Sequence, residues 1–154
     1  MARLHQTPPK AELRADLPIR DGAVEPHRFL TIMRLDVPDL LPGDVVQVMA
    51  QFEATNPYDQ QVMLSHMLTR GEPGEPHGAG WTVIPPARRA GENITPEMHH
   101  AHRTLVGAFV VEQAGPDTIR LVAWAAMRGA TKDMALVIEK GQGGISAIVH
   151  RADC

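Results

Sequence analysis

The chain has 154 residues and a mass of 16.8 kDa, which indicates one domain that is large enough to bury a hydrophobic core. A net charge of −3 at pH 7 and an aromatic fraction of 4% argue against a protein that binds nucleic acid or an anionic membrane surface. The single cysteine, Cys154, excludes an internal disulfide, and no apolar run approaches the roughly 18–20 residues that span a bilayer.

Residues 1–27 are predicted to form an extended, proline-rich N-terminal arm. Prolines at positions 8, 9, 18 and 26 prevent any sustained helical or strand pattern. The apolar anchors of the arm are Leu4, Leu13, Leu17 and Ile19. Such a segment cannot bury these side chains by itself, so we expect it to bind a partner, either a shell or a neighbouring copy of the chain. Deleting residues 1–27 should then leave a folded domain that no longer attaches to its assembly.

Residues 28–154 are predicted to fold as one antiparallel β-sandwich or jelly roll, which makes the whole chain all-β. Apolar and polar residues alternate in segment after segment, and proline- and glycine-rich turns separate the segments. The stretch from Phe29 to Leu35 is expected to turn Phe29, Thr31, Met33 and Leu35 to one face, and residues 87–97 are expected to form a loop. The side chains expected to point inward include Phe52, Leu64, Phe109, Leu121 and Ile138.

Two of the predicted strands are apolar on both faces. Val106 and Val110 alternate with Leu105 and Phe109, and Val122 and Trp124 alternate with Leu121 and Ala123. An antiparallel sheet with one solvated face does not have this pattern. Either the second face is covered within the fold, or it packs on another subunit.

The histidines at 99, 100 and 102 are the sharpest local signal for chemistry. On a strand, His100 and His102 would point to the same side, as metal ligands in β-sheets do. Further ligands would have to come from His66, His77 or His150, and the next acid, Glu112, lies too far along the chain for the pattern of cupins. We therefore predict no bound metal and no cofactor. Serine occurs only at positions 65 and 146 and no nucleotide-binding loop is present, so we predict that the protein is not an enzyme.

The C-terminal half resembles the closing strands of trimeric jelly-roll modules of the TNF/C1q type, and the head-decoration or fibre proteins of tailed bacteriophages that reuse such sandwiches. The resemblance is carried by the segments ENITPEMHHAHRTLVGAFVVEQAG, DTIRLVAWAAM and ALVIEKGQGGISAIVHR. It implies a symmetric homotrimer displayed on a larger assembly. The implied partner is a major capsid protein, and the implied location is the capsid surface of a virion made in a bacterial host's cytoplasm, which agrees with an N-terminus that lacks the apolar stretch of a signal peptide.

The leading hypothesis is therefore a structural virion protein, a decoration subunit that binds the outside of a phage head and stabilises it, with the arm as a tether. A fibre or receptor- or glycan-binding jelly-roll module is the first alternative, with Trp81 and Tyr58 as its aromatic candidates. A metal-dependent jelly-roll enzyme that uses His100 and His102 is the third.

Overall fold

The structure is a computed structural model and describes residues 2–6, 16–21, 29–71, 82–85, 90–94, 100–139 and 143–151. These ranges form β1 (Ala2–Gln6), β2 (Asp16–Arg20), β3 (Leu30–Leu40), β4 (Val45–Thr55), β5 (Val62–Arg70), β6 (Thr82–Val83), β7 (Ala90–Ile94), β8 (His100–Val110), β9 (Gly115–Ala126), β10 (Ala135–Ile138) and β11 (Gly144–His150). None of the ranges contains a helix that is long and apolar enough to cross a membrane.

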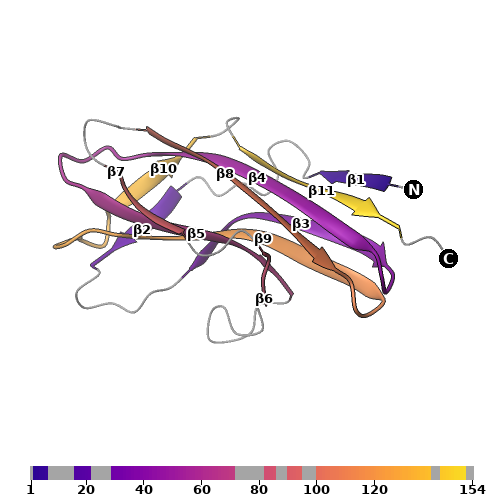
Figure 1. Cartoon of the computed structure of the whole chain (residues 1–154). Helices are drawn as coiled ribbons and strands as arrows, with labels where there is room; N and C mark the ends of the chain where they lie inside the picture. The colour runs from indigo at the N-terminus through magenta and orange to yellow at the C-terminus, as the bar shows by residue number, and fades with distance from the viewer. Residues whose placement is uncertain are drawn as a thin grey trace.

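The strands form two sheets that pack face to face (Figure 1). The β8 sheet has the order β1-β11-β4-β8, and β10 pairs with β4 beyond the end of β11. The β9 sheet has the order β3-β9-β5, and β5 pairs on its other side with β7 and then with β6. The orders β1-β11-β4-β8 and β3-β9-β5-β7 are those of an eight-stranded jelly roll, which confirms the predicted fold class.

The short strand β2 joins the two sheets at one corner. Leu17 lies opposite Leu136 of β10, whereas Ile19 lies opposite Ala125 of β9, in the one parallel pairing among the described strands. A strand that changes sheets in this way closes the corner of a sandwich. Leu17 is 0% exposed and Ile19 is 3% exposed, so both side chains belong to the hydrophobic core.

The described parts of the N-terminal segment are strands, and they do not stand apart from the sandwich. β1 pairs antiparallel with β11 along its whole length, and β2 pairs with strands of both sheets. The predicted domain boundary at residue 27 does not coincide with the observed strand pairing. Leu17 and Ile19 lie on the N-terminal side of that boundary, but their side chains pack in the core of the same chain. Leu13 lies outside the described residues.

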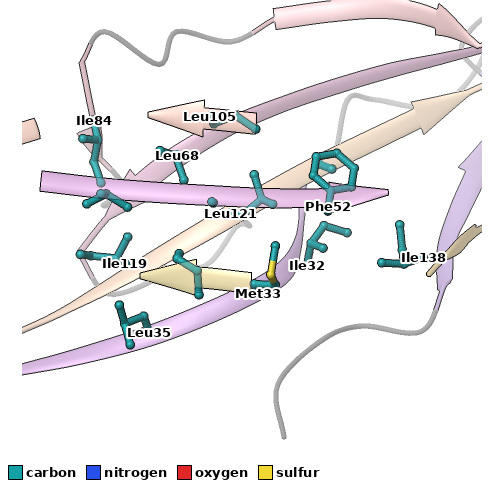
Figure 2. Packing of buried hydrophobic residues seen from close by; sticks show 14 of the residues in the cluster. Ile32, Met33, Leu35, Phe52, Leu68, Ile84, Leu105, Ile119, Leu121 and Ile138 are labelled. Atoms are coloured by element: carbon teal, nitrogen blue, oxygen red, sulfur yellow. The ribbon is translucent and has the colours of Figure 1, made fainter. Parts of the chain in front are cut away.

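The core between the sheets is built from the side chains that the alternating pattern turns inward. The five expected core residues Phe52, Leu64, Phe109, Leu121 and Ile138 are all buried. Figure 2 shows members of this core from both sheets, with Phe52 and Leu105 from the β8 sheet and Leu68 and Leu121 from the β9 sheet.

Two parts of the predicted pattern were wrong. The register of β3 against β9 shifts between Thr31 and Met33, so Ile32 and Met33 are both buried and Thr31 leaves the inward face. The segment 90–94, expected to be loop, is the edge strand β7, which pairs with β5. Asn56 stabilises that pairing, because its side-chain amide donates hydrogen bonds to the carbonyl oxygens of Ile94 (3.0 Å) and Gln60 (2.8 Å).

Candidate assembly surface

Strand β8 divides its apolar residues between the core and the outside of the molecule. Leu105 and Phe109 point into the sandwich, where they are 6% and 8% exposed. Val106 and Val110 point outward and are 54% and 57% exposed. The described part of the chain therefore leaves the second face of β8 uncovered at Val106 and Val110.

The exposed valines belong to a larger patch, because neighbouring strands place similar residues beside them. The strand register aligns three rows across the β8 sheet, and we call their outward positions the β8-sheet face. Its members are Ala2, His150, Val45 and Val110 in the first row, Leu4, Ile148, Gln47 and Ala108 in the second, and Ser146, Met49 and Val106 in the third. Eight of these eleven residues are apolar and none is a lysine, arginine, aspartate or glutamate.

The three polar side chains of the β8-sheet face are His150, Gln47 and Ser146. His150 Nε2 and Gln47 Oε1 are 2.8 Å apart and form a hydrogen bond between adjacent strands. The adjoining row, with Gly144, Gln51 and Thr104, is also uncharged. The next described row on this side of the sheet contains a carboxylate, because Glu53 lies there opposite His102.

The outer face of the β9 sheet is different. Val122 and Trp124 are 0% and 1% exposed, so the second apolar face of β9 is covered within the chain. The outward side of β3 carries Arg34 and Asp36, whose side chains are exposed and form a bidentate ion pair at 3.1 Å. The hydrogen bond from Arg34 lowers the pKa of Asp36 below its usual value. Exposed, paired charges of this kind are typical of a solvated surface, and they lie on the β3 part of this face.

The edge of the β8 sheet at β8 is closed by backbone from the other sheet. The Ala108 amide donates a 2.7 Å hydrogen bond to the carbonyl oxygen of Pro85, which follows β6. Gly107 permits this approach, because a Cβ atom there would lie 2.9 Å from the same oxygen. A foreign strand therefore cannot pair with this part of β8, and the exposed valines are accessible from the face of the sheet rather than from its edge.

Charged groups fasten the end of the sheet that carries Val110. Arg151, just after β11, forms a 3.2 Å ion pair with the fully buried carboxylate of Asp44, in the β3–β4 turn. The same guanidinium and that of Arg3 donate to the carbonyl oxygen of Asp39, at 3.2 and 3.4 Å. The edge strand β1 and its neighbour β11 are thereby held to the end of β3 and the turn that follows it, which keeps the β8-sheet face in register.

The structure does not bring the candidate metal ligands together. Within the described ranges, no group of three or more histidine, cysteine, aspartate or glutamate side chains could hold a metal ion. His102 lies opposite Glu53 and His150 opposite Val45, eight residues apart on β4, or about 27 Å at about 3.4 Å per residue. His66 points into the core, and neither His77 nor the side chain of His100 belongs to the described part.

His66 is a core residue rather than a ligand. Its ring packs edge-on against Phe52, with the ring centroids 5.8 Å apart. Burial, together with the positive charge of Arg103, lowers its pKa to about 4, so the imidazole is neutral at pH 7.

The predicted partner-binding residues are separated by the fold. The side chains of Leu17 and Ile19, both predicted to contact a partner, are buried in the core of the same chain. Leu4 is 60% exposed on β1 and remains available to a partner. Of the aromatic candidates for a glycan site, Tyr58 is half-buried and its hydroxyl accepts a hydrogen bond from the Ala135 amide (3.0 Å), whereas Trp81 lies outside the described residues.

Comparisons with known proteins give the fold but not the family. No family model and no curated protein matches the sequence. Among solved structures, a chain from the structure of infectious bursal disease virus, Gx strain, superimposes with a TM-score of 0.59 and 12% identity over 100% of this chain. The VP2 subviral particle of the same virus gives a TM-score of 0.53 and 12% identity over 96% of this chain.

The present chain spans only about a third of these viral proteins, 34% and 32% of their lengths. The Eiger TNF of S. frugiperda superimposes less closely, with a TM-score of 0.45 at 12% identity, over 100% of this chain and 94% of that one. The chain thus has the jelly-roll fold seen in viral capsid proteins.

Proposed function

We propose that this protein is a structural virion subunit, namely a decoration protein that binds the outside of a tailed-bacteriophage head and stabilises it. In this role it is a homotrimer on the capsid surface, made in the cytoplasm of the bacterial host, and its partner is the major capsid protein. It performs no chemistry; its function is to form protein–protein contacts.

The observation that carries the proposal is the β8-sheet face. The four strands of this sheet present eleven outward residues, none of which is a lysine, arginine, aspartate or glutamate. The outer face of the other sheet is instead covered at β9 and charged at β3. In soluble monomers, exposed apolar patches of this extent mark sites of interaction. The jelly-roll fold shared with viral capsid proteins supports a place for that interaction in a particle shell.

The tether of the proposed subunit begins at β1. Leu4 projects from the outermost strand of the β8 sheet, next to Ile148 of β11. An apolar side chain at a sheet margin can enter a pocket of a shell without any change in the sandwich. Leu13 is the second anchor of the proposal, whereas Leu17 and Ile19 hold the segment to the core.

The test uses heads of the encoding phage that have been assembled without this chain. Purified full-length protein, Leu4→Arg and the control Val83→Arg are each incubated with the heads, and bound protein is measured after sedimentation. Val83 is an exposed apolar strand residue of the other sheet, which makes it a matched control. We expect the wild type and Val83→Arg to bind equally, and Leu4→Arg to need at least a tenfold higher concentration.

Wild-type protein that never sediments with the heads contradicts the decoration role. Binding by Leu4→Arg at wild-type concentrations contradicts the tether while leaving the role in place. Stabilisation is read separately, as the temperature at which decorated and undecorated heads release their DNA.

A further inference from the structure

We infer that the β8-sheet face is the surface through which copies of this chain associate with one another. The inference rests on the proposed function, because it names the first partner of the proposed subunit, and it concerns the centre of the face around Met49 and Val106 rather than the margin at Leu4. The occupant is a second copy of the chain.

The first argument is charge. Near a symmetry axis each side chain meets its own copies, so a charged residue there would face a like charge and lose Coulomb energy. The centre of the β8-sheet face consists of Gln47, Met49, Val106, Ala108 and Ile148, which can all meet themselves without that cost. A face built for a partner of opposite charge would carry charged rows, as the outward side of β3 does with Arg34 and Asp36.

The second argument is area. Strands β4 and β8 have eleven residues each, β11 has seven and β1 has five. With about 3.4 Å per residue and about 4.8 Å between strands, the outer side of this sheet measures about 550 Å² in projection. The uncharged rows from Val45 to Gln51 account for about 420 Å² of this on the same spacings. Stable interfaces bury about 800 Å² of accessible surface per partner and weak ones less than about 600 Å², so the sheet offers a small interface with an uncharged centre and a polar margin.

The third argument concerns geometry. Contact through the sheet edge is prevented at the middle of β8, where Pro85 O already accepts the hydrogen bond from the Ala108 amide. The exposed valines of β8 can instead be covered by face packing, in which apolar side chains of two sheets interdigitate about 10 Å apart. Val106, Val110 and Met49 are each about half exposed and project from this face.

The first experiment measures the mass of the full-length protein by sedimentation equilibrium between about 1 and 100 μM, the range in which modest interfaces assemble. It compares the wild type with Val106→Arg and with Val83→Arg as the matched control on the β9 sheet. We expect the wild type and the control to form a closed oligomer of the 16.8 kDa chain. Val106→Arg should need a protein concentration at least tenfold higher than the wild type to form the same oligomer. Thermal unfolding of all three proteins confirms that the substitutions at these exposed sites leave the fold intact.

A wild type that is monomeric throughout this range overturns the inference, and so does an oligomer that Val106→Arg leaves as stable as the control. Neither result bears on binding to heads through Leu4, so the decoration role is tested separately; a monomeric wild type would remove only the homotrimer from the proposed function. A heterologous partner on this face would appear as a monomeric wild type whose binding to heads is weakened by Val106→Arg.

The second experiment locates the contact directly. Cysteine is placed at Met49, or at Met63 on the outward side of β5 as the control, in a background with Cys154→Ser. A short bismaleimide is then added to dilute protein. Covalent oligomers from Met49→Cys but not from Met63→Cys support the inference, and equal yields from the two positions, or none from Met49→Cys, overturn it.

Discussion

Gly107 of β8 lies directly against Ile84: a Cβ atom on the glycine would come within 2.7 Å of Ile84 Cγ2 and within 2.9 Å of the carbonyl oxygen of Pro85. The contact joins the two sheets, because Ile84 follows β6 of the β9 sheet and its amide donates a hydrogen bond to Leu68 O of β5. Glycine at this position therefore allows backbone from one sheet to close the edge of the other.

Replacing Gly107 with alanine should lower the free energy of unfolding by about 1–3 kcal/mol, because the methyl group must displace backbone and not only a side-chain end. Urea unfolding measures the change. Gly144→Ala is the matched control, since a Cβ atom on that strand residue meets nothing within 4 Å, and it should change stability by less than about 0.5 kcal/mol. Equal effects of the two substitutions would show that the β6–β8 contact does not form.

Replacing Arg151 with methionine should destabilise the fold by about 1–3 kcal/mol, because the fully buried carboxylate of Asp44 loses the guanidinium 3.2 Å away. Arg34→Met is the control. It breaks an ion pair of similar length with Asp36, but both of those side chains are about half exposed, so the cost should stay below about 1 kcal/mol. The two midpoints in urea give the comparison, and a smaller loss for Arg151→Met than for Arg34→Met would contradict the buried pair.

The sequence predicts the long strands of this fold well because one face of each is buried. In β4, Val46, Val48, Ala50, Phe52 and Ala54 are all in the core, as their alternation indicates. The signal weakens where a strand is short or irregular. β2 contains Pro18 and only two core residues, and β7 contains Gly91 and Asn93, so long-range pairing rather than local preference makes them strands.

The candidate site could be predicted only in part, for a related reason. Val106 on β8 and Val122 on β9 have the same sequence context, an apolar residue between apolar neighbours. One is 54% exposed and the other is 0% exposed. The pattern identifies a second apolar face, but which face the chain itself covers depends on tertiary packing that alternation does not encode. Likewise, Leu4 and Leu17 look alike as anchors, and only strand pairing separates them.

Acid should destabilise the protein through His66. The pKa of the buried imidazole is about 4 in the folded chain, below its usual value of 6.5, so the unfolded chain binds more protons between these pH values. Stability is therefore fully present above about pH 6.5 and falls as the pH decreases toward 4, by on the order of 3 kcal/mol for this group at about 1.4 kcal/mol per pH unit.

The measurement is the free energy of unfolding in urea at pH 7 and at pH 4.5 for the wild type, His66→Gln and the exposed-site control His150→Gln. His66→Gln should be less stable at pH 7 but should lose less stability on acidification than the other two proteins. The same acid loss in all three would remove His66 as its source. His5, whose pKa is also lowered by burial, acts in the same direction in each protein and cancels from the comparison.

Truncation separates the two N-terminal strands. Removing residues 1–6 deletes β1. Among the described strands β1 pairs only with β11, and its Leu4 side chain is exposed to solvent in the intact chain, so the sandwich should remain folded without it. Removing residues 1–20 also deletes Leu17 and Ile19, whose burial contributes about 1.5–3 kcal/mol each, and uncovers β10 and the end of β9. Against a typical free energy of unfolding of about 5–15 kcal/mol, that loss should lower the melting temperature sharply or prevent folding.

Leu17→Ala in the intact chain should by itself lower the free energy of unfolding by about 2–5 kcal/mol. If the fragments 21–154 and 7–154 have the same melting temperature, β2 does not close the corner of the sandwich. Residues 1–27 would then form an arm separate from the domain.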